Sequence, residues 1–263
     1  MNTREDKLNA FGRLLDIMDE LREKCPWDMK QTNESLRHLT IEETYELSDA
    51  IIKNDFQEIK KELGDVFLHI VFYARIASEQ NKFDIADVCH ALCEKLIVRH
   101  PHIYGDVKVE NAEQVKENWE QIKLKEGNRS VLSGVAKGTP SIVKAYRMQE
   151  KAAQVGFDWP TKHDVWAKVE EEWNELKVEL NKPNNEHLTE KEFGDFLFAL
   201  INVARKYGIN PDDALEKTNQ KFINRFQHIE TTATKKLTEM TLEEMDILWN
   251  EAKQKENNPS IPE

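Results

Sequence analysis

Hydrophobic residues recur along this chain at the three- and four-residue spacing of an α-helix, and they do so in the same order in both halves. In the first half the pattern predicts helices near residues 8–24, 40–54, 56–78, 85–99 and 112–126. In the second half it predicts helices near residues 141–155, 164–181, 188–207, 212–231 and 242–255. No segment is rich in strand signals. We therefore expect an all-α fold made of two tandem helical bundles.

Helix-breaking residues mark the boundary between the two halves. Gly127-Asn128-Arg129-Ser130, Gly134, Gly138 and Pro140 form the segment richest in breakers. This predicts an N-terminal domain of residues 1–126, a linker of residues 127–140 and a C-terminal domain of residues 141–256. Residues 257–263, which contain two prolines, are expected to form a disordered tail.

Each half contains a Glu-x-x-Glu pair that is followed 16 or 17 residues later by a Glu-x-x-Asp pair. These residues are Glu43, Glu46, Glu62 and Asp65 in the first half, and Glu172, Glu175, Glu192 and Asp195 in the second. Residues three apart share one face of a helix. The pairs are also equidistant from a turn, at Asn54 or at the Pro183-Asn184 step. An antiparallel helix hairpin would therefore bring four carboxylates to one height, where they suit a hard divalent cation.

Basic and aromatic residues follow the carboxylates in each half, as Lys-x-x-x-Arg and then Trp-x-x-x-Lys. They are Lys95, Arg99, Trp119 and Lys123, and Lys221, Arg225, Trp249 and Lys253. Clustered carboxylates repel one another unless they hold cations, and ligation by oxygen alone selects Mg²⁺ or Mn²⁺. Lys and Arg can contact phosphate oxygens, and Trp can stack on a base. The repeated set therefore indicates chemistry on a phosphoanhydride.

Charge and composition exclude several classes of partner. A formal net charge of −12 over 263 residues argues against a protein that coats nucleic acid. The first residues lack the apolar core of a signal peptide, and no apolar run approaches the roughly 18 residues of a membrane helix. We expect no membrane partner.

The cysteines Cys25, Cys89 and Cys93 are odd in number and form no Cys-x-x-Cys motif. This usage is typical of a reducing compartment, so we expect a cytoplasmic location. Cys89 and Cys93, with nearby histidines, could be read as zinc ligands. Their spacing matches no standard zinc module, and small thiols buried on a helix explain them better.

Other interpretations of the acidic motif compete with catalysis. A single Glu-x-x-Glu in an acidic chain is usually a solvated helix face, and duplication of a structural bundle could preserve the pattern. A non-catalytic nucleotide sensor or a protein-binding scaffold is a further alternative. A di-iron bundle is disfavoured because no histidine has Glu three residues before it, and a P-loop is absent. An aromatic residue beside an Asp precedes the acidic pairs in each half, as Trp27-Asp28 and Phe157-Asp158. The recurrence of these five elements in one order favours an enzyme.

Glu42-Glu43-x-x-Glu46 with Glu62-x-x-Asp65, and Glu171-Glu172-x-x-Glu175 with Glu192-x-x-Asp195, resemble the signature of the MazG family. Cys25-Pro26-Trp27-Asp28, Arg99-His100-Pro101-His102 and Val155-Gly156-Phe157-Asp158-Trp159 also resemble its tandem, two-domain bacterial members. The resemblance implies bundles of the all-α NTP pyrophosphatase type. It implies Mg²⁺-dependent cleavage of nucleoside triphosphates between the α- and β-phosphates, which gives the monophosphate and pyrophosphate. It also implies a homodimer whose chains complete the sites.

The two copies differ at positions that bear on function. Lys168 lies one helical turn before Glu172, whereas Leu39 lies at that position before Glu43. Asn219 lies two residues before Lys221, whereas Cys93 lies two residues before Lys95. We therefore expect the C-terminal copy to be the main catalytic centre. Its four carboxylates would hold the ions, and one of them or Glu171 would orient the attacking water. The N-terminal copy would bind metal, hydrolyse weakly or serve chiefly in the dimer.

Overall fold

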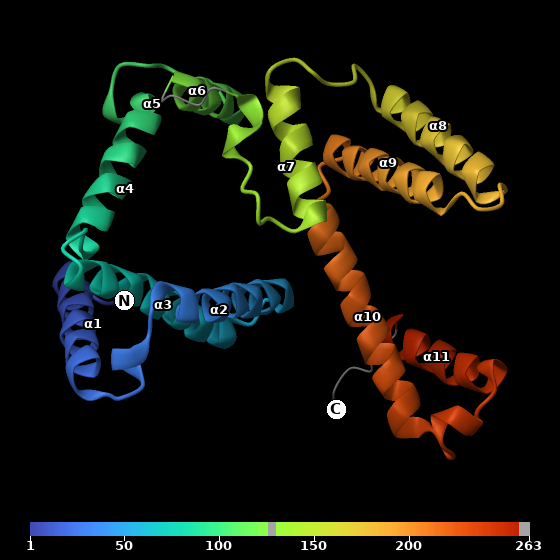
Figure 1. Cartoon of the computed structure of the whole chain (residues 1–263), viewed down its shortest axis with the longest axis horizontal. Helices are drawn as coiled ribbons and strands as arrows, with labels where there is room; N and C mark the ends of the chain where they lie inside the picture. Colours follow the sequence, from blue (N-terminus) through green and yellow to red (C-terminus); the bar gives the residue numbers. More distant parts are fainter. Residues whose placement is uncertain (126–129, 258–263) are drawn as a thin grey trace. The chain divides into compact units, whose positions relative to one another are not determined.

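The computed structural model describes residues 1–125 and 130–257 (Figure 1). Within these ranges the chain forms α-helices and short 3-10 turns and contains no strand, which confirms the predicted all-α class. It divides into two compact units, Met1–Ile122 and Lys123–Glu263. None of the described helices is both long and apolar enough to span a membrane.

The N-terminal unit is organised around a helix hairpin. Its helices are α1 (Arg4–Lys24), α2 (Asn33–Lys53), α3 (Phe56–Glu79), α4 (Ile85–Arg99), α5 (Pro101–Tyr104) and α6 (Ala112–Lys125), with the 3-10 turn η1 (Asp28–Lys30) after α1. Helices α2 and α3 run side by side, and α1 packs against α3 (Figure 1). Met18, Leu36, Val71, Phe72 and Ile76 form the buried core of this unit.

Helix α2 begins seven residues earlier than the apolar pattern predicts, and the prediction of a start near Thr40 is wrong. The Thr32 hydroxyl accepts a hydrogen bond from the Ser35 amide at 3.2 Å, and the Ser35 hydroxyl accepts one from the Thr32 amide at 2.9 Å. This reciprocal capping box satisfies two amides at the helix start. Leu36 and Leu39 are the only apolar residues between Asn33 and Thr40, so the hydrophobic pattern is too sparse there to show the helix start.

The C-terminal unit repeats the hairpin and adds a second one. Its helices are α7 (Ser141–Gln154), α8 (Lys162–Leu180), α9 (Glu186–Lys206), α10 (Pro211–Thr232) and α11 (Leu242–Asn257), with the 3-10 turns η2 (Val131–Gly134) and η3 (Leu237–Glu239). Helices α8 and α9 pair, α7 packs against α9 and η2, and α10 pairs with α11 (Figure 1). Residues 131–134 of the expected linker therefore pack on α7. The expected tail, apart from residue 257, lies outside the described residues.

Left-handed asparagines close both carboxylate hairpins. Asn54 ends α2 with φ 56°, and Asn184 lies in the turn between α8 and α9 with φ 53°. Asparagine adopts this conformation more readily than most residues, so it suits a tight reversal between helices. The two residues are 130 positions apart, as are Asp65 and Asp195. The duplicated hairpins therefore share the same turn residue at the same place.

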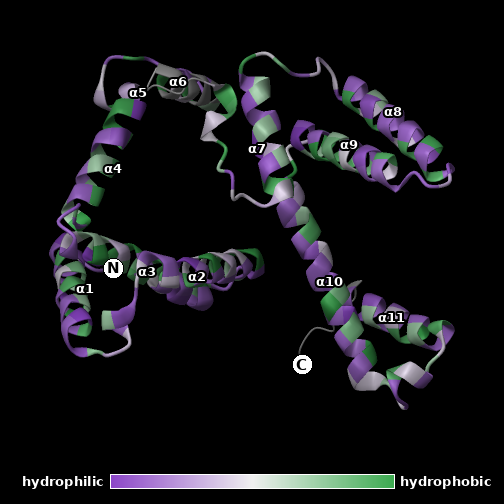
Figure 2. Cartoon of the chain, viewed as in Figure 1, coloured by the Kyte–Doolittle hydropathy of each residue, from purple (hydrophilic) through white to green (hydrophobic). Residues whose placement is uncertain are grey.

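Large apolar side chains remain exposed on several helices of the single chain. Figure 2 shows hydrophobic positions on the visible faces of α4 and α10. Leu96 and Val98 of α4, Phe193 of α9, and Phe222 and Ile223 of α10 are between 43% and 58% exposed. Single exposed apolar residues are ordinary, but repeated ones on paired helices indicate surfaces that another chain can cover.

Candidate active site

The C-terminal carboxylate cluster is built by the α8–α9 hairpin. Glu172 comes from α8, and Glu192 and Asp195 come from α9. One oxygen of each of the three carboxylates lies within 4.8 Å of the others. Glu172 is 7% exposed and Glu192 is 8% exposed, whereas Asp195 faces solvent. The hairpin thus brings three acids together at the edge of its buried face.

Two lysines balance this negative charge. Lys168 Nζ lies 2.6 Å from Glu172 Oε1 and 2.9 Å from Glu171 Oε1. Lys191 Nζ lies 2.8 Å from Glu192 Oε1 and 3.2 Å from Asp195 Oδ2. The hydrogen bond to Glu172, and then that to Glu171, raises the pKa of Lys168 above its ordinary value. Both lysines are therefore fully protonated at neutral pH.

Glu192 Oε2 is buried and has no hydrogen-bond partner among the described residues, and the same holds for Glu62 Oε2 in the other copy. A buried carboxylate oxygen without a partner is costly. A cation would satisfy it, and three converging carboxylates offer the oxygen-only donor set that Mg²⁺ prefers. The residues present in both copies therefore fit a hard divalent ion.

Glu175 lies at the exposed rim of this cluster, outside the group of three converging acids. Desolvation by the neighbouring protein, and then the nearby charges of Glu172 and Glu192, raise the pKa of Glu175. The structure thus gathers three of the four metal ligands expected from the sequence and places the fourth beside them. Glu175 can complete the set by turning its side chain, because it is exposed.

The N-terminal copy has the same arrangement on α2 and α3. Glu43, Glu62 and Asp65 converge within 4.8 Å, and Glu46 is exposed. Burial, followed by the charge of Asp65, raises the pKa of Glu43. Lys61 Nζ lies 2.7 Å from Glu62 Oε1.

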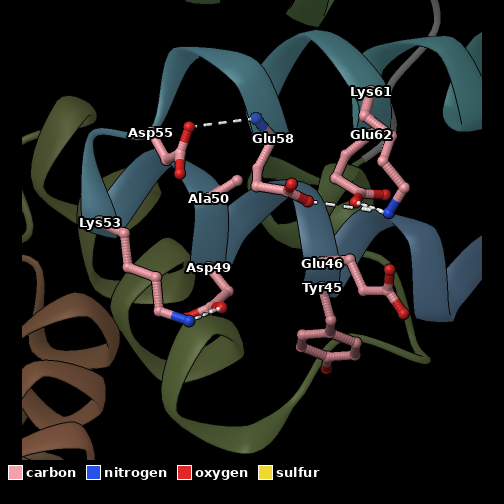
Figure 3. A pocket seen from close by; sticks show the side chains of 9 residues that line it. All are labelled: Tyr45, Glu46, Asp49, Ala50, Lys53, Asp55, Glu58, Lys61 and Glu62. Atoms are coloured by element: carbon pink, nitrogen blue, oxygen red, sulfur yellow. Dashed lines mark hydrogen bonds and ion pairs between the residues drawn. The ribbon is translucent and has the colours of Figure 1, made fainter.

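A cavity of about 580 Å³ opens at the turn end of the α2–α3 hairpin (Figure 3). Glu46 and Glu62 line it together with charged residues nearer the turn. Figure 3 shows Lys61 between Glu58 and Glu62, and Lys53 paired with Asp49. Seven of its nine lining residues are charged, and Tyr45 and Ala50 supply its apolar part.

The C-terminal cluster instead adjoins a mixed cavity of about 560 Å³. Lys168, Glu172 and Asp195 line one part of it, and Phe157, Trp159 and Phe198 supply aromatic walls. Met148 and Asn202 also line this cavity. The equivalent residues of the N-terminal unit, 130 positions earlier, are Met18 and Phe72. Both of these are buried in the core. Within the described residues, the cavity beside the C-terminal cluster thus has three aromatic side chains in its walls, whereas the cavity at the N-terminal cluster is lined mainly by charged ones.

The profile of the MazG nucleotide pyrophosphohydrolase domain matches the chain twice, over residues 31–104 and 161–230. These two ranges contain both hairpins and every carboxylate described above. The chain belongs to the MazG family. The profile match confirms the resemblance drawn from the acidic motifs. The name of the family identifies the chain as a hydrolase.

Full-length relatives carry matching names. A protein of Escherichia coli (strain K12) named nucleoside triphosphate pyrophosphohydrolase is 40% identical, over 95% of this chain and 99% of its own length. A protein of Thermotoga maritima named nucleoside triphosphate pyrophosphohydrolase/pyrophosphatase MazG is 43% identical, over 92% and 95%. The uncharacterized protein YabN of Bacillus subtilis is 46% identical over 96% of this chain, which covers 54% of that protein.

The basic and aromatic residues of the MazG chain form pairs of their own. The Arg99 guanidinium lies 5.9 Å from the Trp119 ring centre, and that of Arg225 lies 5.4 Å from the Trp249 ring centre. Arg225 also pairs with Glu256 at 2.6 Å. The repeated Arg–Trp contact shows that the spacing noted in the sequence brings these residues together in both copies.

These residues do not reach the carboxylates within the described part of the chain. Asn219 donates to Glu216 at 3.1 Å, and Lys95, Lys221 and Lys253 are exposed. None of the set predicted on α10 and α11 lines the mixed cavity or bonds to its acids. The side chain of Lys123 lies outside the described residues.

Several site residues carry signals that hydrophobic periodicity does not use. Lys61 and Lys191 each precede the first acid of a repeated Lys-Glu-x-Gly-Asp motif, which would have identified them. Gln149 and Asn202 line the mixed cavity, but they come from different helices and have no counterpart in the other copy. No pattern in the sequence distinguishes these two amides from ordinary surface residues.

Proposed function

We propose that the chain is a Mg²⁺-dependent nucleoside triphosphate pyrophosphohydrolase that cleaves between the α- and β-phosphates, with its main centre in the C-terminal copy. The observation that carries this proposal is the convergence of Glu172, Glu192 and Asp195 beside a cavity of mixed character. Membership of the MazG family and the names of the full-length relatives support the reaction class.

The proposed metal ligands are Glu172, Glu175, Glu192 and Asp195, with Mn²⁺ as a possible substitute for Mg²⁺. When bound, the ion would polarise a phosphate oxygen and acidify a coordinated water. Glu171 is exposed and lies outside the converging group, where its carboxylate can hold and orient a water molecule. Lys168 offers a point charge that can move from Glu172 to a phosphate oxygen.

The remaining basic residues are proposed to act across a homodimer. Asn219, Lys221, Arg225, Trp249 and Lys253 do not contact the acids of their own described chain, although sequence spacing selects them as phosphate and base contacts. Phe193 and Leu197, one turn apart on α9, are 52% and 45% exposed. Covering such apolar surface favours association. A second chain packed on the hairpin would bring its own basic helices toward the cluster.

Product identity tests the reaction. The full chain would be incubated with a panel of ribo- and deoxyribonucleoside triphosphates, with and without Mg²⁺, and the products separated by ion-exchange chromatography. We expect monophosphate and pyrophosphate in equal amounts, and no turnover after chelation. Release of orthophosphate with the diphosphate would refute the cleavage site. Light scattering at micromolar concentration tests the homodimer, which a monomeric mass would exclude.

A further inference from the structure

The mixed cavity beside the C-terminal acids contains an amide acceptor that no described residue satisfies. Gln149, on α7, is 7% exposed and lines the cavity. Its Oε1 has no hydrogen-bond partner within the described residues. Buried amide oxygens are nearly always hydrogen-bonded in folded proteins. The unpaired Oε1 therefore indicates a ligand that donates a hydrogen bond.

The orientation of the Gln149 amide is fixed by its other end. Gln149 Nε2 donates to the backbone carbonyl of Phe198 at 2.8 Å. A carbonyl oxygen can only accept, so turning the amide over would place two acceptors against each other. Gln149 therefore holds an unpaired acceptor beside the cavity, covered by its neighbours in the free chain, and cannot exchange it for a donor.

The amide of Asn202 is also held in one orientation, but here the oxygen is engaged and the NH2 group is left unpaired within the described residues. Arg205 Nε donates to Asn202 Oδ1 at 2.9 Å, and a guanidinium can only donate. Arg205 is itself held by an ion pair with Asp158. The Asn202 Nδ2 group has no acceptor in the described part of the chain, so Asn202 offers a donor in the same cavity.

Both amides are anchored within about one turn of α9. Gln149 bonds to the Phe198 carbonyl, and Phe198 and Asn202 are four residues apart, about 6 Å along the helix. Phe157 and Trp159 supply aromatic rings in the same cavity. Aromatic side chains stack well on planar ligands.

The N-terminal unit lacks both amides of this arrangement. Asp19 lies at the position of Gln149 and pairs with Arg75, which is equivalent to Arg205. Phe72 lies at the position of Asn202 and is buried in the core. The amide pair is therefore a property of the C-terminal copy alone.

We propose that this cavity binds the base of the nucleotide and that Gln149 and Asn202 hydrogen-bond to its Watson–Crick edge. Gln149 Oε1 accepts from the exocyclic amino group of adenine or cytosine, and Asn202 Nδ2 donates to the neighbouring ring nitrogen. The inference rests on the proposed hydrolysis only for the direction of the triphosphate, which would extend toward Glu172 and Asp195. Gln149 is thereby a specificity-determining residue for nucleotides that carry such a donor.

Nucleotides that lack only the donor test the contact. We would measure kcat/KM for ATP against purine riboside triphosphate, and for CTP against its analogue without the 4-amino group. The comparison uses whichever pair wild type hydrolyses faster. In that pair we expect kcat/KM to be about 10- to 100-fold higher for the nucleotide with the amino group, because its analogue leaves a buried acceptor unpaired. Gln149→Met should reduce this ratio to near unity by lowering the rate on the amino nucleotide. Asp19→Asn, at the equivalent N-terminal position, should keep the ratio.

A binding measurement separates this inference from the proposed reaction. Calorimetric titration of the full chain with AMP and with purine riboside monophosphate requires no cleavage, and circular dichroism would confirm that each variant is folded. We expect wild type and Asp19→Asn to bind AMP at least fivefold more tightly, and Gln149→Met to bind both equally. Discrimination without any turnover would refute the hydrolysis and keep the base contact. Turnover of both members of a pair at equal kcat/KM would refute the base contact and keep the hydrolysis.

Discussion

Lys168 Nζ lies 2.6 Å from Glu172 Oε1, one helical turn away, whereas the apolar Leu39 occupies the equivalent position before Glu43. The two carboxylate clusters are otherwise matched, since Lys61 and Lys191 pair with the first acid of each Glu-x-x-Asp. The C-terminal cluster therefore has one more cation within reach of a bound phosphate. This asymmetry predicts unequal roles for the two copies.

Replacing one acid in each copy tests that division. Glu172→Gln removes a proposed metal ligand with little change in shape, and it should lower kcat/KM by about 10²-fold or more. Glu43→Gln should cost less than about threefold in kcat/KM, a change of under about 0.7 kcal/mol in transition-state stabilisation. Steady-state rates of pyrophosphate release would be compared after circular dichroism shows equal helicity. If Glu43→Gln abolishes turnover and Glu172→Gln does not, the active copy has been assigned wrongly.

Removing the lysine tests its proposed phosphate contact. Lys168→Met keeps the aliphatic chain but loses the charge, and it should lower kcat/KM by about tenfold or more because a charge-assisted contact is lost. Lys177→Met, an exposed lysine on the same helix, changes the net charge equally and is the matched control. Equal effects of the two substitutions would show that only net charge matters.

Magnesium should stabilise the protein more strongly at pH 7 than at pH 5. Desolvation and acidic neighbours raise the pKa of Glu175, so in the metal-free fold this carboxylate holds a proton up to a higher pH than in the unfolded chain. The ionised Glu175 therefore destabilises the metal-free fold. The effect is full above the folded-state pKa, decreases as the pH falls through that pKa, and is absent below the unfolded-state pKa. Metal must displace the proton, so affinity rises as pH rises. Differential scanning calorimetry should show a larger Mg²⁺-dependent rise in Tm at pH 7.

Glu192→Gln tests whether the Mg²⁺-dependent rise in Tm comes from the C-terminal cluster. It removes one of the converging carboxylates, so the Mg²⁺-dependent rise in Tm should shrink in proportion to the lost affinity. The matched substitution Glu62→Gln would report the N-terminal copy. A rise in Tm that neither substitution changes would place the ion elsewhere.

Acid should destabilise the N-terminal unit through His69. Its Nδ1 lies 2.6 Å from the Thr40 hydroxyl, which also lies 2.6 Å from the Tyr73 hydroxyl. Burial lowers the pKa of His69, and the charge of Asp65 opposes this only partly. The folded state therefore binds a proton less readily than the unfolded state. Stability is full above the unfolded pKa of about 6.5 and is lost as pH falls below it.

The measurement is Tm between pH 7 and pH 5 for wild type, His69→Gln and His38→Gln. His69→Gln should flatten the decrease in Tm, because the buried titrating group is gone. His38 is exposed on α2, so His38→Gln should follow wild type. The same decrease in all three proteins would exclude His69 as its source.

Helical periodicity was sufficient to predict the fold class and most helix positions, because apolar residues recur on one face of most helices, including α4, which has no buried residue in the single chain. It also predicted the convergence of Glu172, Glu192 and Asp195, since equal distances from a turn give equal heights in a hairpin. It failed at the start of α2, where Thr32 and Ser35 cap the helix through polar contacts. It also missed the short helix α5. The expectation that Cys89 and Cys93 are buried was wrong, because both are exposed on α4.

The mixed cavity could not be predicted in this way. Its amide groups acquire a direction only from tertiary partners, Phe198 for Gln149 and Arg205 for Asn202. In the N-terminal unit, Phe72 fills the corresponding space, and this becomes apparent only when the register between the two units is known. The repeated order of the motifs correctly predicted that Arg225 and Trp249 belong to one group. It does not show where this pair lies relative to the acids.

The buried cores described for the two units share no residue. One is centred on Phe72 and the other on Val169 and Ala199, and the first contains larger side chains. Cooperativity in unfolding comes from shared burial, so each core sets its own melting behaviour unless a further interface couples them. The chain then has two stabilities rather than one. A mutation in either half would change the population of partly folded molecules in which the other half keeps its hairpin and its carboxylates in place.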